Sequence, residues 1–155
     1  GAGGAGRAIA FAVAGAGARS LTVCDADEQR ARSLAESVAA ETGCATRVGP
    51  PDPRGHHIVI NATPLGMGAN DPLPVDPERL EPDMLVVDII NSPHSTPLCR
   101  AAREKGCSTQ DGGHLHRGQA RLVLRFLGLN QDADGEPGGL PPEHAQPDQA
   151  MTRAS

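Results

Sequence analysis

Residues 1–17 read GAGGAGRAIAFAVAGAG, and this stretch decides the predicted fold. Gly1, Gly3 and Gly6 fit the GxGxxG pattern, whose glycines allow a tight turn, a close approach to a pyrophosphate and close packing of helix on strand. Apolar residues then recur at helical spacing, so we expect a helix over residues 4–16 with its N-terminus facing the phosphates. Methyltransferases use a similar loop, so the pattern alone leaves the class of ligand open.

The rest of the chain alternates short apolar runs with amphipathic segments. Apolar runs predict strands over residues 20–25, 45–48, 57–62, 84–90 and 107–110. Helical spacing predicts helices over residues 27–43, 95–106 and 118–129, with a helical turn near residues 77–80. The alternation indicates an α/β fold with a doubly wound, Rossmann-like parallel sheet over residues 1–129. Residues 130–155 are Pro-rich and polar, which predicts a disordered tail.

Composition narrows the class of protein. The chain has 155 residues, a net charge of -5, two Phe and no Tyr or Trp, which argues against nucleic acid as a partner. Cys24, Cys44, Cys99 and Cys107 form no CxxC pair, so we expect reduced core thiols in a cytoplasmic protein. No apolar run approaches the roughly 20 residues of a membrane span. The HxH formed by His114 and His116 has no third ligand at matching spacing, so we expect no metal site.

Asp25 suggests which nucleotide would bind. It lies 19 residues after Gly6, at the end of a predicted strand, where a carboxylate can accept hydrogen bonds from both ribose hydroxyls of an adenosine. The same carboxylate repels a 2'-phosphate, at a cost of at most about 4 kcal/mol for two charges roughly 4 Å apart. We therefore expect NAD to be preferred over NADP. The alternative is that Asp25 only caps the helix that starts near Asp27.

Four motifs together resemble a known family. They are GAGGAGRA at the start of the chain, INATPLGM at 60–67, VVDIINSPHSTPLCRAAREKGC at 86–107 and DGGHLHRGQA at 111–120. In order and spacing they resemble the C-terminal NAD(P)-binding domain of the shikimate/quinate dehydrogenase family. The resemblance implies hydride transfer between NAD(P) and shikimate, quinate or their 3-dehydro forms.

The resemblance also implies individual site residues. It assigns cofactor binding to Gly1, Ala2, Gly3, Gly4, Ala5, Asp25, Arg30, Asn61, Thr63, Pro64, Ile89, Gly112 and Leu115. It assigns substrate binding to Asn91 and Gln119, although Asn91 stands where the family has a tyrosine and Leu115 where it has a methionine. Arg30 matches an arginine that lies over the adenine in NAD-preferring members.

The resemblance assigns no catalytic residue to this chain. The family's catalytic Lys/Asp pair belongs to a substrate domain that we expect this chain to lack, and Lys105 lies in a C-terminal helical turn, where it serves the helix dipole. We therefore expect a chain that binds cofactor but is inactive alone. With the first strand truncated, two buried strands lack a neighbour, which predicts low stability or a homodimer. A methyltransferase and a non-catalytic nucleotide-binding module are the alternatives.

Overall fold

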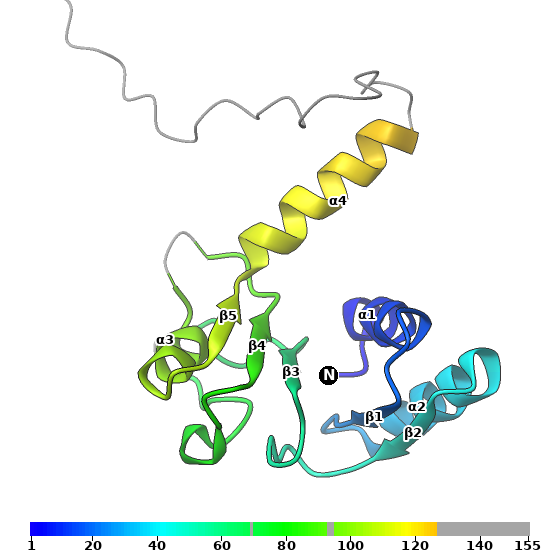
Figure 1. Ribbon diagram of the computed structural model, residues 1–155, viewed down its shortest axis with the longest axis horizontal. Coiled ribbons are helices and arrows are strands. Elements are labelled where there is room, and N and C mark those ends of the chain that lie inside the picture. Colours follow the sequence, from blue (N-terminus) through cyan, green and yellow to red (C-terminus); the bar gives the residue numbers. More distant parts are fainter. Residues whose placement is uncertain (69, 93–94, 127–155) are drawn as a thin grey trace, which may run out of the picture. The chain divides into compact units, whose positions relative to one another are not determined.

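The computed structural model describes residues 1–68, 70–92 and 95–126 (Figure 1). The chain divides into two units, Gly1–Gly118 and Gln119–Ser155. All the described strands belong to the first unit. The last described helix begins in the first unit and ends in the second.

The order of helices and strands follows the alternation expected from the sequence. The strands are β1 (Ser20–Val23), β2 (Ala45–Val48), β3 (Ile58–Asn61), β4 (Leu85–Asp88) and β5 (Ser108–Gln110). The helices are α1 (Gly4–Gly15), α2 (Glu28–Thr42), the 3-10 turn η1 (Pro77–Arg79), α3 (Pro97–Glu104) and α4 (Gly112–Phe126).

The main difference from the sequence prediction is the start of α4. This helix begins at Gly112, six residues before the predicted start at residue 118. The Asp111 carboxylate accepts a hydrogen bond from the His114 N–H at 3.3 Å, so it serves the first turn in spite of the two glycines there. The last predicted helical residues, 127–129, and the predicted tail, 130–155, lie outside the described residues.

All the strand pairs are parallel, and they form two sheets. One sheet contains β1 and β2, and the other has the order β3-β4-β5. No described strand pairs with the inner edge of β1 or of β3. The parallel α/β organisation is therefore confirmed, with the described strands in two separate sheets.

The first sheet is covered by α1 and α2 (Figure 1). Small side chains on α1, Ala10 and Ala14, pack in one core with Leu34 and Val38 of α2. Because alanine side chains are short, α1 and α2 can approach each other closely. Leu34 and Val38 are buried in the same core, and the burial of each stabilises the fold by roughly 1.5–3 kcal/mol. The helix α2 ends at Gly43, whose φ of 72° is the left-handed conformation that glycine adopts readily.

A separate core holds α3 against the second sheet. Its largest fully buried members are Met84, Val86 and Leu98, and Cys107 is buried in the same core. The Thr96 hydroxyl accepts a hydrogen bond from the Cys99 N–H at 3.3 Å and so caps α3. Cys44, Cys99 and Cys107 are buried free thiols as expected, whereas Cys24 is half-buried.

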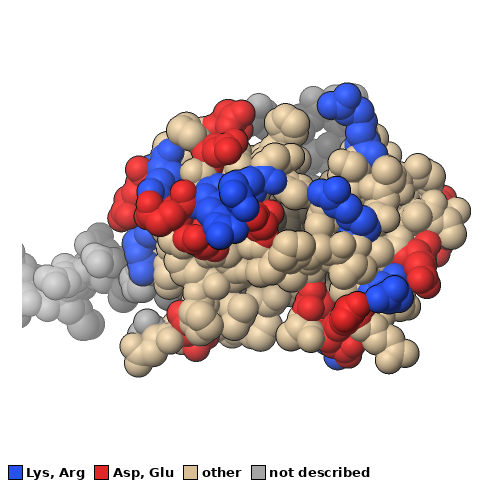
Figure 2. All heavy atoms as spheres, turned by 90° about the horizontal axis from the view of Figure 1, so that it is seen from below, with Lys and Arg blue, Asp and Glu red and all other residues tan. Residues whose placement is uncertain are grey.

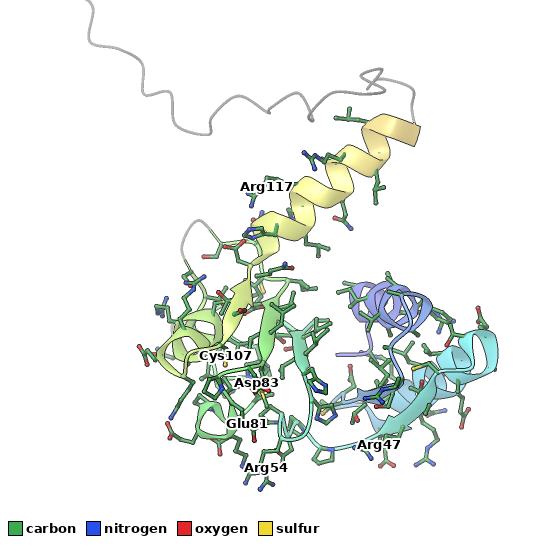
Figure 3. All side chains as sticks on the ribbon, viewed as in Figure 1. Arg47, Arg54, Glu81, Asp83, Cys107 and Arg117 are labelled. Carbon is green, nitrogen blue, oxygen red and sulfur yellow. The ribbon has the colours of Figure 1, made fainter. Side chains whose placement is uncertain are left out.

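On the face shown in Figure 2, acidic and basic side chains lie beside one another. Asp52 contacts Arg54 at 2.5 Å and Arg79 at 2.8 Å. Figure 3 shows Glu81 and Cys107 together near the amino ends of β4 and β5, where the thiol donates to the Glu81 carbonyl at 3.1 Å. Among the described helices, none is both long and apolar enough to cross a membrane.

Candidate functional site

The glycine turn, residues 1–6, lies at the carboxyl end of β3. A Cβ added to Gly1 would lie 2.5 Å from the Ala62 carbonyl oxygen and 2.9 Å from Cγ2 of Thr63. A Cβ added to Gly6 would overlap the carbonyl oxygen of Gly1. Both positions therefore require glycine because backbone approaches backbone there. This agrees with the roles that the pattern assigns to the first and third glycines.

The N-terminus of α1 is suited to an anion. Gly3 is the N-cap residue and supplies no side-chain hydrogen bond, and the first turn carries no acid. An added Cβ on Gly3 or Gly4 would meet no atom within 4 Å, so the space beside the turn is open. The N–H groups of the first turn have no partner within the helix. They point, with the positive end of the helix dipole, toward this space, which fits a phosphate group.

Asp25 is held beside the turn by backbone hydrogen bonds. Its Oδ2 accepts from the Ala2 N–H at 2.6 Å, and its Oδ1 accepts from the Asp27 N–H at 2.9 Å. These two bonds, the one from Ala2 above all, lower the pKa of the Asp25 carboxyl. Each carboxylate oxygen has two lone pairs, so both can accept a further hydroxyl. The cap of α2 is Asp27, which accepts from the Arg30 N–H at 3.1 Å, so Asp25 is not the helix cap.

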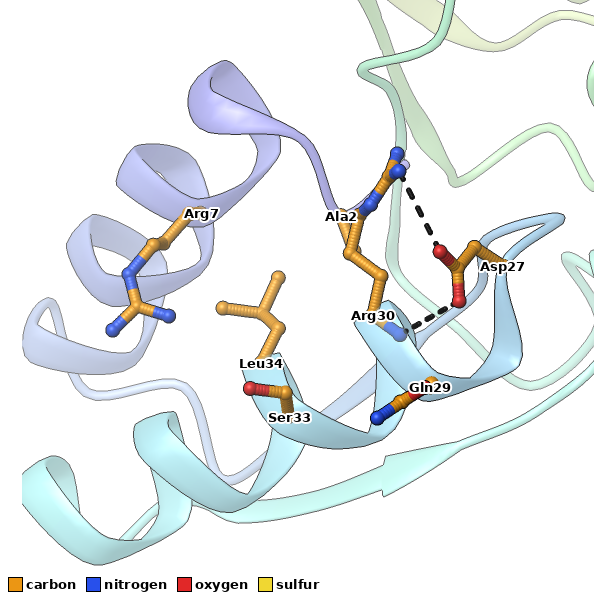
Figure 4. Close-up of a pocket in the computed structure, with 7 residues that line it drawn as sticks. All are labelled: Ala2, Arg7, Asp27, Gln29, Arg30, Ser33 and Leu34. Carbon is orange, nitrogen blue, oxygen red and sulfur yellow. Dashed lines mark hydrogen bonds and ion pairs between the residues drawn. The ribbon is translucent and has the colours of Figure 1, made fainter.

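Arg30 and Asp27 line a pocket (Figure 4). The Arg30 guanidinium is 3.5 Å from Oδ2 of Asp27 and 4.0 Å from Oδ1 of Asp25. The pocket has a volume of about 270 Å³ and is lined by Ala2, Arg7, Asp27, Gln29, Arg30, Ser33 and Leu34. The structure thus places Arg30, Asp25 and the start of the glycine turn together.

Asn61 shapes the loop after β3. This side chain is only 3% exposed. Its Nδ2 donates to the Leu65 carbonyl and to Oδ1 of Asp88, both at 3.1 Å. Its Oδ1 accepts from the Thr63 N–H at 3.0 Å and from the Thr63 hydroxyl at 2.7 Å. Asn61 is therefore engaged within the protein, and it is Thr63 and Pro64 that reach the surface of the loop.

Asp88 is a residue that the sequence interpretation missed. It ends β4 directly beside Asn61 in the parallel register and is fully buried. Its Oδ1 also accepts from the Ile90 N–H at 3.2 Å. The signal was present in the sequence, because an acid at the end of the apolar run LVVD lies at the same edge of a parallel sheet as the Asn of IVIN.

The other predicted site residues form a buried or half-buried group around the start of α4 and an exposed pair. A Cβ on Gly112 would lie 2.7 Å from the Ile89 carbonyl oxygen, so the start of α4 is pressed against Ile89, and half-buried Leu115 follows in the first turn. Asn91 is exposed just after the second sheet. Gln119 is exposed on α4 and begins the second unit.

Lys105 takes the place expected for it, at the C-cap of α3, where its Nζ lies 2.7 Å from Oε2 of Glu78. The His114 ring is 2.9 Å from Oδ1 of Asp111, and this hydrogen bond lowers the pKa of the Asp111 carboxyl. In the part of the chain that the structure describes, no three His, Cys, Asp or Glu side chains gather as a metal site.

Parallel strands, a glycine turn and an acid after β1 define a Rossmann-like α/β protein. Solved structures agree. The chain matches quinate dehydrogenase from Corynebacterium glutamicum in complex with NAD with a TM-score of 0.73 and 36% identity, covering 81% of this chain and 47% of that one. It matches shikimate 5-dehydrogenase from Thermus thermophilus, in complex with NADP(H) and shikimate, with a TM-score of 0.72 and 33% identity, covering 81% and 46%. A 5-ketofructose reductase of Gluconobacter gives a TM-score of 0.74 and 31% identity, covering 81% and 48%.

Curated sequences point the same way. The chain is 38% identical over 141 residues to a shikimate dehydrogenase (NADP(+)) of Pseudarthrobacter chlorophenolicus, covering 86% of this chain and 48% of that protein. It is 39% identical over 140 residues to a quinate/shikimate dehydrogenase (NAD(+)) of Corynebacterium glutamicum, covering 85% and 49%. No protein-family model matches the chain. The chain is a homologue of the shikimate/quinate dehydrogenases and spans about half the length of the curated relatives it matches.

Proposed function

We propose that this chain binds a nicotinamide adenine dinucleotide at the carboxyl ends of β1, β3 and β4. The bound dinucleotide would supply or accept the hydride of a dehydrogenase reaction. The observation that carries the proposal is the hydrogen bond from the Ala2 N–H to Asp25, which joins the anion-binding turn to a ribose-binding acid. The first-turn N–H groups of α1 would hold the pyrophosphate, beside Gly1, Gly3 and Ala5.

The preferred cofactor would be NAD. Relatives carry both NAD and NADP in their names, so the choice depends on this chain's own residues. Asp25 has its pKa lowered and stays ionised at neutral pH, which favours two ribose hydroxyls and disfavours a 2'-phosphate. Arg30, which a 2'-phosphate would need as a partner, is already within 4.0 Å of two carboxylates.

The substrate would be shikimate, quinate or a related polyhydroxy acid. Ile89, Gly112 and Leu115 would lie near the nicotinamide, while Asn91 and Gln119 would contact the substrate. The relatives are about twice as long as the matched part, and the paired Lys105 is unsuited to proton transfer. The chain would therefore act as the cofactor-binding part of the enzyme, with residues 1–129 as its nucleotide-binding domain. Its location would be the cytoplasm, and it would form a homodimer.

A titration of the 155-residue chain with NADH and NADPH tests this function. Bound NADH is followed by the change in its fluorescence, and binding is repeated in increasing salt. We expect NADH to bind at least about tenfold more tightly than NADPH. Equal affinities would overturn the NAD preference, and no binding of either would overturn the nucleotide site.

The methyltransferase alternative is tested by thermal unfolding of the same chain with each ligand. Stabilisation of the chain against heat by S-adenosylmethionine but not by NADH would favour it. The non-catalytic module is distinguished by activity, because a split enzyme would reduce 3-dehydroshikimate once a substrate domain is supplied, whereas a module would not. The similarity to curated dehydrogenases favours the dehydrogenase over the methyltransferase and over the non-catalytic module.

A further inference from the structure

A buried carboxylate oxygen at the end of β4 has no partner. Asp88 is 0% exposed, and its Oδ1 accepts hydrogen bonds from Asn61 and from the Ile90 N–H. Its Oδ2, in contrast, is the one buried side-chain oxygen or nitrogen among the described residues that has no hydrogen-bond partner. An unpaired buried carboxylate oxygen destabilises a fold. The stability of β4 therefore does not explain why an acid stands here.

The carboxylate sets the direction of a chain of hydrogen bonds. Because a carboxylate only accepts, Asn61 must turn its Nδ2 toward Asp88 and its Oδ1 toward Thr63. The Thr63 hydroxyl then donates to Asn61, and its oxygen accepts from the Leu65 N–H at 3.1 Å. Along this chain Leu65 donates to Thr63, Thr63 donates to Asn61, and Asn61 donates to Asp88. The orientation of the Asn61 amide therefore determines the hydrogen bonds of the whole loop.

This loop is one wall of the glycine turn. The Ala62 carbonyl oxygen and Cγ2 of Thr63 are the atoms closest to a Cβ placed on Gly1. A reversed Asn61 amide would turn its Nδ2 toward the Thr63 N–H and its Oδ1 toward the Leu65 carbonyl, so the loop would lose both of these hydrogen bonds and would no longer hold this position. We propose that Asp88 is a positioning residue, which fixes the Asn61 amide and thereby holds residues 62–65 against the turn that binds the nucleotide. This inference rests on the proposed nucleotide site.

The test compares Asp88→Val with Thr96→Val. Val at position 88 removes the acceptor for Asn61. Thr96 offers a matched control, because it is also buried, at 2% exposed, and its hydroxyl also accepts one N–H, that of Cys99. Asp88→Val loses two buried hydrogen bonds and Thr96→Val loses one, so both variants should lower the unfolding temperature. Only Asp88→Val should alter the loop.

Two measurements separate positioning from stability. For Asp88→Val we expect hydrogen exchange of the Thr63 and Leu65 amides to become at least about tenfold faster, and the Kd for NADH to rise about tenfold. For Thr96→Val we expect both quantities to stay within about twofold of the parent chain. The positioning role is overturned if the two variants behave alike while both are folded by circular dichroism.

The conservative variant Asp88→Asn gives a rescue. Its Oδ1 can keep both hydrogen bonds while the amide nitrogen replaces the unpaired oxygen. We expect loop exchange and NADH affinity within about threefold of the parent chain, with an equal or higher unfolding temperature. Loss as large as in Asp88→Val would show that the charge, not the acceptor, matters and would overturn the inference.

A second pair of variants covers the case in which Asp88→Val does not fold. Thr63→Val removes the hydroxyl between Asn61 and Leu65, whereas Thr63→Ser keeps it. The readout is the amide of residue 63, which donates to Asn61 and not to the removed hydroxyl. Faster exchange of this amide in Thr63→Val alone supports the inference, and equal exchange in both variants overturns it. If the parent chain binds neither NADH nor NADPH, the proposed function fails, yet amide exchange still decides whether Asp88 positions the loop.

Discussion

The N–H of Ala2 donates a 2.6 Å hydrogen bond to Oδ2 of Asp25, so the second residue of the glycine turn is tied to the segment that follows β1. The bond gives the candidate site two chemically different sides. The start of α1 offers N–H groups to a phosphate, whereas Asp25 offers only acceptors. A ligand that suits both sides carries a pyrophosphate and a ribose with free hydroxyls.

Replacing Asp25 should narrow the difference between the two dinucleotides. In Asp25→Asn the ratio of the Kd for NADPH to that for NADH should fall by at least about tenfold, since a charge beside the 2'-phosphate is removed. Isothermal titration with each nucleotide gives the ratio. The matched control is Glu28→Gln, which removes a charge three residues along the chain that instead pairs with Arg32 at 2.6 Å. An unchanged ratio in Asp25→Asn would contradict the role of this acid.

Asp25 should also contribute to the pH dependence of stability. Its pKa is lowered in the folded chain by the N–H groups of Ala2 and Asp27, from an unfolded value of about 3.9. Its contribution is therefore present above about pH 4 and is lost as the pH falls through the folded pKa. Urea unfolding of the parent chain and of Asp25→Asn should differ by a constant amount from pH 7 to about 5 and converge below about pH 4. A difference that grows on acidification would refute this.

Gly112 should be intolerant of any side chain. A Cβ there would lie 2.5 Å from the Ile90 carbonyl oxygen, so Gly112→Ala should destabilise the chain by about 1–3 kcal/mol. Gly118 provides the comparison, because a Cβ on it meets nothing within 4 Å and alanine favours a helix. Gly118→Ala should be neutral or stabilising by up to about 1 kcal/mol. Thermal unfolding of both variants decides, and similar effects would refute the close approach.

The inner edge of β3 should make the chain self-associate. Ile58 is 46% exposed although it lies in an apolar run, because no described strand pairs with that edge. A lysine on an edge opposes pairing with another strand, so Ile58→Lys should lower the association constant about tenfold or more in sedimentation equilibrium. Val48→Lys on β2, 37% exposed, is the control and should have less effect. A strictly monomeric parent chain would refute the prediction.

Sequence patterns predicted the helices and strands well where a single local cause sets them. The runs IVIN and LVVD became β3 and β4, and Gly43 ends α2 with a positive φ. The start of α4 was wrong because two glycines disfavour a helix, whereas the Asp111 carboxylate supplies its first turn with a partner. That hydrogen bond depends on the direction in which the chain leaves β5 and enters α4. The helix propensities of single residues carry no information about this direction.

The candidate site was less predictable. The resemblance named Asn61, but its burial and its four hydrogen bonds depend on β4 lying beside β3. Asp88 escaped notice because an acid within an apolar run resembles the end of a strand and nothing more. The hydrogen bond between Asp25 and Ala2 was likewise not foreseen, since 23 residues separate them and tertiary packing brings them together.

The division of the sheet has a consequence for cooperativity. Asp25 follows β1, while Asn61 and Asp88 end strands of the other sheet, and each sheet has its own hydrophobic core. Among the described strands no backbone ladder joins the two sheets, so we expect their two cores to unfold with low cooperativity. A dinucleotide that touches both would make them melt as one, and the midpoint would rise with the logarithm of its concentration. The ligand would then complete the folding unit as well as occupy the site.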